Sequence, residues 1–264
     1  MACSKHPAPR HHGPSQAPKP ATRSDVEAHA TTPLSGPSPA PQSTSDAAAP
    51  HRDQPSSSPA LQPRDTPNAV GLGRVYLQPL GRDLEAADLE FIAQTLGVFY
   101  TLSVTVCAPL DLPAEAYYPP RSRYRAEKLL DYLAEVRPLD AHVIVGLTTV
   151  DISTTKGAHA DWGVLGLATV AGKDCVISKF RAGRGAKDQN HTRERLAKTV
   201  VHEVGHTLGL PHCPHEGCLM EDGQGTVTTT DHEFDLCPSC QALVSSWVRP
   251  HSKLDLPWPD PRVP

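Results

Sequence analysis

The chain has 264 residues, of which 38% are hydrophobic, and it carries a formal net charge of −4 at pH 7 with a pI near 6.4. This mildly acidic balance contains no basic stripe, so we expect no nucleic-acid partner. The sequence also lacks any run close to the roughly 18 apolar residues that a membrane-spanning helix needs, and we expect no transmembrane segment.

Composition divides the chain into three parts. Residues 1–70 contain 14 of the 28 Pro, no Phe, Tyr or Trp, and few large aliphatic residues. Such a segment cannot bury enough apolar surface to offset the entropy lost on ordering, so we expect a disordered tail. Residues 73–250 are expected to form one packed domain, and residues 251–264 a Pro-rich C-terminal tail.

The first residues bear on the cellular compartment. No apolar segment precedes Cys3, which favours a cytoplasmic protein. Met1 to Ser4, followed by a polar tail, also resembles the end of a bacterial lipoprotein signal. The alternative is therefore a cell-envelope lipoprotein whose true start lies upstream of Met1, with Cys3 as its lipidated residue.

Apolar periodicity predicts that strands and helices alternate in the first half of the domain. The expected elements are, in chain order, a strand at 74–80, a helix at 84–96, a strand at 101–107, a Pro-rich loop at 108–120, a helix at 124–136 and a strand at 141–150. Crossover helices connect parallel strands, so the pattern predicts an α/β fold with a mixed, mostly parallel twisted sheet. The last strand is apolar throughout, which is typical of a strand covered on both faces.

The next segment predicts an antiparallel edge and a long helix. Strands at 163–170 and 175–180 are joined by a short link that contains Gly, and this spacing favours a hairpin. A basic loop is expected over 181–190. Thr192 is then the expected N-cap of a helix that runs to about Leu208.

That helix carries a metal-binding pattern. His202 and His206 are four residues apart, which places both imidazoles on one helical face, and Glu203 lies between them. Gly209 is able to adopt a positive φ, ending the helix and returning the chain so that His212 becomes a third ligand. Three neutral imidazoles leave a fourth position open for water, which is typical of catalytic zinc. Glu203 is placed to take a proton from that water.

A chance occurrence of His-Glu-x-x-His is the competing interpretation of this pattern. Two further conditions argue against it, namely Gly209 and His212 at fixed spacing after the second histidine. The helix also has an apolar stripe on its other side, formed by Leu196, Ala197, Val200, Val201, Val204 and Leu208. We therefore expect a metal site on a helix that packs against a core.

Four of the seven cysteines form a second constellation. They are two short-spaced pairs, Cys213 with Cys218 and Cys237 with Cys240. Four thiolates in such pairs suit a closed tetrahedral zinc site. Such a site would stabilise the C-terminal region, which is poor in apolar residues. The alternatives are two disulfides or reduced buried cysteines, and a cytoplasmic setting argues against disulfides.

Together these residues resemble the signature of the archaemetzincin (archaelysin) family of zinc metallopeptidases. The resemblance rests on His202-Glu203-x-x-His206-x-x-Gly209-x-x-His212-Cys213, on Cys218 and Met220, and on Cys237-x-x-Cys240. It implies a metzincin-like zincin domain with an active-site helix and a zinc-stapled C-terminal region. It further implies two zinc ions per chain, a catalytic one on His202, His206 and His212 and a structural one on Cys213, Cys218, Cys237 and Cys240.

The resemblance also assigns roles to two other residues. Glu203 would be the general base, and Met220 would be the methionine of the Met-turn, an apolar floor beneath the catalytic metal. The acidic pair Glu221 and Asp222 departs from the pattern expected of the family. This departure affects the expected shape of the pocket and leaves the metal ligands unchanged.

We therefore expect a monomeric metallopeptidase, with aminopeptidase-like activity, that takes a peptide or protein as substrate. An extended substrate would add a strand to the edge at 163–170. His159, Asp161 and Trp162 precede that edge, where they would either line the cleft or be solvated. Two alternatives stay open: a non-catalytic, zinc-stabilised peptide-binding module, and a hydrolase of a non-peptide amide.

Overall fold

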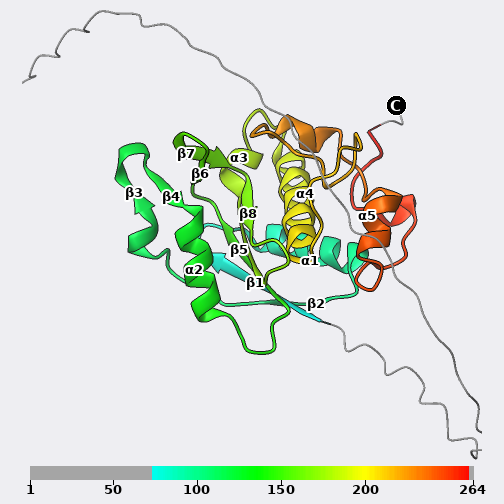
Figure 1. Cartoon of the computed structure of the whole chain (residues 1–264), viewed down its shortest axis with the longest axis horizontal. Coiled ribbons are helices and arrows are strands. Elements are labelled where there is room, and N and C mark those ends of the chain that lie inside the picture. The colour runs from blue at the N-terminus through cyan, green and yellow to red at the C-terminus, as the bar shows by residue number, and fades with distance from the viewer. Residues whose placement is uncertain (1–72, 262–264) are drawn as a thin grey trace, which may run out of the picture. The chain divides into compact units, whose positions relative to one another are not determined.

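The computed structural model describes residues 73–261, and a five-stranded sheet lies within this range (Figure 1). Its order is β2-β1-β5-β9-β8, with the bounds Ser103–Val106, Arg74–Leu80, Val143–Thr148, Asp174–Ser178 and Gly166–Ala168. Strand β1 pairs in parallel with β2 and β5, and β5 pairs in parallel with β9. Strand β8 runs antiparallel to β9 at the edge. The expected α/β class with a mostly parallel sheet and an antiparallel edge strand is confirmed.

Helices cover both faces of this sheet. Helices α1 (Ala86–Phe99) and α4 (Gln189–Thr207) cover one face, and α2 (Ala126–Val136) covers the other. The short helix α3 (Lys179–Ala182) follows β9, and α5 (Pro238–Leu243) belongs to the C-terminal segment. Alternate residues of β5 explain the arrangement, because Val143, Val145 and Leu147 belong to the core cluster that includes α1 and α4. Ile144 belongs to the opposite cluster, with α2. The expectation that this strand is covered on both faces is therefore confirmed.

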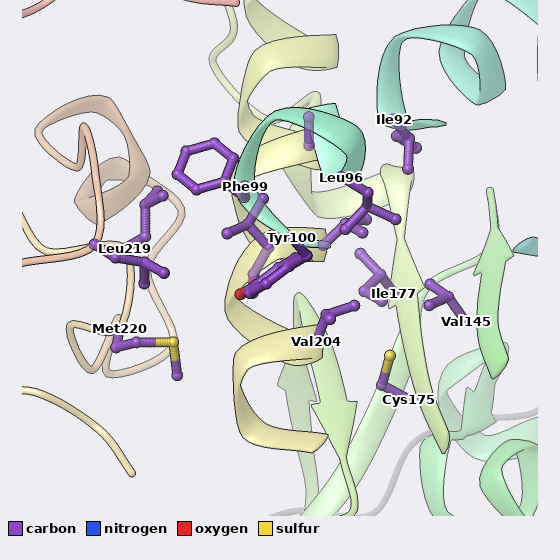
Figure 2. Packing of buried hydrophobic residues seen from close by; sticks show 14 of the residues in the cluster. Ile92, Leu96, Phe99, Tyr100, Val145, Cys175, Ile177, Val204, Leu219 and Met220 are labelled. Atoms are coloured by element: carbon purple, nitrogen blue, oxygen red, sulfur yellow. The ribbon is translucent and has the colours of Figure 1, made fainter. Parts of the chain in front are cut away.

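The core between the sheet and α4 holds the long helix in place (Figure 2). Leu96 from α1, Ile177 from β9 and Val204 from α4 are fully or almost fully buried in it. Tyr100 lies among them and donates a hydrogen bond of 2.9 Å from its hydroxyl to the carbonyl oxygen of Val201. Helix α4 is thus fixed along its apolar stripe, which leaves its other face to form a site.

A second, four-stranded sheet was not expected from the sequence. It has the order β3-β4-β6-β7, with the bounds Tyr117–Tyr118, Arg123–Arg125, Ile152–Lys156 and His159–Val164. Asp151, just before β6, accepts hydrogen bonds from Arg123 at 2.8 Å and from Arg181 of α3 at 2.7 Å. This ionic contact ties the second sheet to the chain that leads into α4.

Several expected boundaries are wrong. The helix expected over 124–136 begins at Ala126, because Tyr124 and Arg125 belong to β4, and the strand expected over 175–180 ends at Ser178, because α3 begins at Lys179. The strand expected over 163–170 is divided at Leu165 between β7 and β8, because its first residues pair with β6 in the second sheet. Helix α4 begins at Gln189 rather than after Thr192, because the carboxylate of Asp188 accepts the backbone N–H of His191 and caps the helix. Thr192 lies inside the first turn.

The C-terminal boundary at residue 250 is wrong as well. Leu256 and Trp258 are buried, and the indole N–H of Trp258 donates to the carbonyl oxygen of Phe234 at 2.9 Å. Trp258 also stacks on Phe99 with ring centroids 5.7 Å apart. The packed domain therefore extends at least to Trp258. The predicted N-terminal tail lies outside the described residues, and among the helices that are described none has the length and apolar character to cross a membrane.

Candidate active site

Helix α4 presents two histidine rings in a defined tautomer. The Nδ1 of His202 is 2.7 Å from the carbonyl oxygen of Leu219, and that of His206 is 2.7 Å from the carbonyl oxygen of Leu210. A carbonyl only accepts, so each Nδ1 must carry the proton, and each Nε2 is left with its lone pair free. The two Nε2 atoms lie 3.0 Å apart. Both rings therefore point one ligand atom at the same place.

The turn after α4 brings a third ring to this point. Gly209 has a φ of +97°, a conformation that side-chain-bearing residues rarely adopt, and it reverses the chain after the helix. The ring of His212 comes to lie 5.4 Å from that of His202 and 4.8 Å from that of His206, measured between centroids. One nitrogen from each of the three rings lies within 4.8 Å of the others, close enough to share an ion.

The electrostatics of the site favour neutral imidazoles. Burial and the neighbouring His206 lower the pKa of His202 to about 3, and burial lowers the pKa of His206 as well. A neutral ring is the form that binds a metal. Tetrahedral zinc, with nitrogen ligands at about 2.0–2.1 Å, would hold its ligand atoms roughly 3.3 Å apart. The separation of 3.0 Å between the first two rings fits that geometry.

Glu203 is buried beside these rings, where it is 7% exposed. Burial raises the pKa of its carboxyl group to about 8. Gly166 of β8 packs directly on this side chain, and a Cβ atom added to Gly166 would lie 2.6 Å from Oε1 of Glu203. The edge strand thus leaves room for the carboxyl group only because residue 166 is glycine.

Met220 lies on the other side of α4 from the sheet and is fully buried (Figure 2). Its backbone carbonyl accepts the N–H of Cys213 at 2.7 Å. This bond connects the methionine to the residue that follows His212. Met220 therefore forms apolar packing under the turn that carries the third ring.

The three rings open onto a cleft of about 450 Å³. Residues of β6, β7 and β8, of α4 and of the segment 221–233 line it. Trp162 of β7 belongs to this lining and packs against Gly225, so β7 and the segment 221–233 are in contact there. Asp161 is instead held by Arg123 at 2.8 Å, and His159 is exposed outside the lining.

The four cysteines of the second constellation also lie together. All are free thiols, and one sulfur from each lies within 4.8 Å of the others. The sulfur of Cys213 is 3.7 Å from that of Cys237, and Cys218 is 3.8 Å from Cys240. Tetrahedral zinc with Zn–S bonds of about 2.3 Å places its sulfur atoms roughly 3.8 Å apart, so the spacing fits a zinc ion rather than disulfides.

Backbone N–H groups point at these sulfurs. Met220 and Cys237 donate to Cys218 at 3.5 and 3.4 Å, and His215 donates to Cys213 at 3.4 Å. Such bonds stabilise negative charge on sulfur. At Cys218 burial is the larger effect and raises the pKa to about 11, and the two backbone hydrogen bonds offset part of this rise. Burial on its own would raise the pKa of Cys237, but hydrogen bonds from Cys240 and Cys213 lower it to about 7.

Known proteins share these features. The model of Peptidase family M54 matches residues 106–246, which include the three histidines and the four cysteines. The archaemetzincin of Halobacterium salinarum is 32% identical over 178 residues, covering 65% of this chain and 99% of the relative. The chain belongs to the archaemetzincin family of zinc metallopeptidases. An archaemetzincin from Haloarcula marismortui is similarly related, at 33% identity over 177 residues, with 64% of this chain and 98% of the relative covered.

Solved archaemetzincins have the same fold. The Methanopyrus kandleri structure has a TM-score of 0.60 at 25% identity, and the match covers 69% of this chain and 98% of that one. The Archaeoglobus fulgidus structure, a complex with malonate, has a TM-score of 0.55 at 30% identity, covering 64% and 99% of the respective chains. The family resemblance expected from the motifs is confirmed, and with it a zinc metallopeptidase class.

Sequence reasoning missed several polar residues of this archaemetzincin cleft. Thr199, Thr230 and Glu233 line it. Thr199 lies three residues before His202 in α4. Glu233 has no local pattern that marks it, and only the fold brings it to the site.

Proposed function

We propose that this archaemetzincin hydrolyses peptide bonds, with His202, His206 and His212 holding the catalytic zinc and Glu203 acting as general base. The observation that carries the proposal is the convergence of three imidazole nitrogens, two of them in a fixed tautomer, beside a buried carboxyl group. A site with only a structural role has no use for a carboxyl group at its open side.

Each residue of the site has a separate task. Zinc, when bound, supplies a Lewis acid that polarises a carbonyl group and acidifies water. The carbonyl oxygens of Leu219 and Leu210 hold the rings of His202 and His206 in orientation. Glu203 takes the proton of the attacking water and then delivers it to the nitrogen of the leaving amine.

The edge strand supplies a place for the substrate backbone. Strand β8 is an edge strand of the five-stranded sheet. One of its edges pairs with β9, and among the described residues the other edge has no neighbouring strand in this sheet. Gly166, Leu167 and Ala168 also line the cleft. A peptide laid along this edge in an extended form would be held by main-chain hydrogen bonds, with its carbonyl groups near Glu203.

Aminopeptidase-like action would need an anionic group for the substrate's terminal amine. Asp222 lines the cleft, and the backbone N–H of Gln224 is the main cause that lowers the pKa of its carboxyl group. An ionised carboxylate at this place would attract an α-ammonium group. Peptides with a free or an acetylated N-terminus, compared as substrates, separate this activity from cleavage inside a chain.

The four cysteines support the proposal of a second, structural zinc. Their free thiols are compatible with a reducing compartment, which supports the proposal of a cytoplasmic protein. Fractionation of cells that make the protein tests the compartment. Recovery with the cell envelope would favour the lipoprotein alternative.

The decisive experiment compares two variants of the zinc-loaded protein with a peptide library. Glu203→Gln should keep its zinc but lose turnover, because the ligands are intact and the base is absent. His206→Ala should lose zinc as well. Chelator should abolish cleavage by the wild type. If Glu203→Gln cleaves at the wild-type rate, the base is wrongly assigned. If the wild type binds peptides without cutting them, the binding-module alternative holds, and cleavage of amide compounds alone would favour the non-peptide alternative.

A further inference from the structure

Glu233 is a buried carboxyl group on the wall of the cleft. It lies two residues after the short helical turn Thr228–Asp231 and is only 3% exposed. It nevertheless belongs to the cleft lining. Within residues 73–261 its side chain makes no hydrogen bond or ion pair, and its oxygens are not among the fully buried atoms that lack a partner, so they face the cleft. A carboxyl group that is mostly buried but open to a cleft is available to a partner that arrives with a ligand.

The cation that faces Glu233 has other partners. Lys198 is buried, and its Nζ lies 2.7 Å from Oε1 of Glu194 and donates to the carbonyl oxygen of Thr230 at 2.9 Å. It also lies over the ring of Trp258, at 5.3 Å from the centroid. These contacts use two of the three donors of Lys198. Its charge lowers the pKa of Glu233, but the two side chains form no ion pair within 4.0 Å.

The other charges that act on Glu233 are negative. Burial is the main reason that its pKa rises to about 8; the charge of Lys198 lowers this pKa, and the carboxylates of Glu221 and Asp231 raise it. Among the described residues that line the cleft, Lys156 is the one Lys or Arg, and it is exposed on β6. The lining formed by the described residues therefore places no Lys or Arg against Glu233, and Lys198 lies behind the lining with its own partners.

The carboxyl group of Glu233 lies on the part of the cleft next to the histidine site. Thr199 lines the cleft three residues before His202, a distance of about 4.5 Å along the helix axis. The bond from Lys198 to Thr230 ties the segment before Glu233 to the same turn of α4. A side chain that enters here would belong to a substrate residue close to the bond that is cut.

We propose that Glu233 is a specificity-determining residue that binds the cationic side chain of a Lys or Arg residue of the peptide substrate. The inference rests on the proposed peptidase function. A long side chain with a charged end reaches a buried carboxylate without bringing the peptide backbone with it. The charge-assisted hydrogen bonds that form would give Glu233 the partner it lacks.

Selective binding without turnover tests this inference separately from catalysis. The zinc-loaded Glu203→Gln variant is mixed with a randomised peptide library, and the peptides that stay bound after ultrafiltration are identified by mass spectrometry. We expect Lys or Arg to be enriched about tenfold or more at one position. Adding Glu233→Gln should remove the enrichment. Adding Glu135→Gln, the same change on an exposed residue of α2, should preserve it.

Each outcome is informative. A retained fraction without enrichment, or no retained peptide at all, overturns the role of Glu233. The enrichment is first measured with the Glu203→Gln variant alone, so this result does not depend on whether Glu233→Gln folds. Circular dichroism and zinc content then test whether the variant that also carries Glu233→Gln is folded. Cleavage by the protein with Glu203 intact is assayed in parallel. Absence of cleavage together with Lys or Arg enrichment contradicts the proposed function and leaves the binding site standing.

Discussion

The sulfur of Met220 lies against Gly205 of helix α4, so close that a Cβ atom added to Gly205 would be 2.5 Å from it. The same Cβ atom would also be 3.3 Å from Leu210, whose carbonyl oxygen holds the ring of His206. Gly205 therefore lets the buried methionine pack under the metal-binding turn. Glycine at the position before His206 in the His-Glu-x-x-His pattern is thus required by packing against Met220.

Replacing Gly205 with alanine should destabilise the protein. Overpacking of a core costs about 1–3 kcal/mol, whereas alanine gains at most about 1 kcal/mol over glycine in a helix. We expect the free energy of unfolding to fall by roughly 1 kcal/mol, as measured by urea denaturation of the zinc-loaded protein. Gly97 of α1 is the matched control, because a Cβ atom there meets nothing within 4 Å. Gly97→Ala should stabilise, and equal effects of the two substitutions would contradict the packing argument.

Gly166→Ala should impair turnover while leaving zinc in place. The added methyl group would lie 2.6 Å from Oε1 and 2.7 Å from Cγ of Glu203, so the carboxyl group must move. A displacement of about 1 Å in a catalytic group costs roughly 10–100-fold in rate. We expect kcat to fall in that range with zinc content unchanged, since the histidine hydrogen bonds are untouched. Unchanged kcat would mean that Glu203 has more freedom than the structure indicates.

The four cysteines predict the zinc content directly. Wild-type protein should bind two zinc ions, and the Cys213→Ser, Cys218→Ser double variant should bind one, measured by elemental analysis of purified protein. The loss should also lower the thermal midpoint, because the site joins the chain after His212 to helix α5. Cys107→Ser removes a free thiol outside the cluster and should retain both ions. A double variant that still holds two ions would contradict the assignment.

Strong local patterns made the centre of the fold predictable. The strand expected at 74–80 has the bounds of β1, and Gly209 has the positive φ expected of it. Both signals are local, since apolar alternation and a glycine after a helix act over a few residues. The same holds for the histidine and cysteine spacings, which lie within one helix and two short turns.

The features that were missed depend on distant parts of the chain. Strand β6, from Ile152 to Lys156, is half exposed and polar at its end, so it has no clear alternation. Trp258 lies in a Pro-rich segment that composition assigns to a tail, yet its ring finds Phe99 across the core. Glu233 likewise becomes part of the cleft only through the contacts that hold its segment on α4.

Asp231 gives the protein a predictable sensitivity to acid. Its carboxylate accepts two hydrogen bonds from Arg195, at 2.6 and 2.7 Å, and lies 2.8 Å from Nε2 of His191. Burial alone would raise its pKa, but the hydrogen bonds from Arg195 and His191 lower it to about 2. The folded-state pKa is thus below the ordinary value of 3.8. The stabilisation is therefore complete above about pH 4 and is lost as the pH falls toward 2.

Asp231→Asn should accordingly be most damaging at neutral pH. It leaves the guanidinium of Arg195, which is 3% exposed, without its carboxylate, so we expect a loss of roughly 2–3 kcal/mol at pH 7. The gap between wild type and variant should narrow by roughly 1–2 kcal/mol between pH 5 and 2, after allowance for screening of the partly exposed Asp231. The gap in unfolding free energy is measured by urea denaturation at each pH. Release of zinc at acid pH affects both proteins alike, because both have the same zinc ligands, so it largely cancels from the gap. Asp131→Asn, on the exposed face of α2, is the matched control and should show only a small gap at pH 7. A constant gap for Asp231→Asn would show that the pair with Arg195 does not set the acid stability.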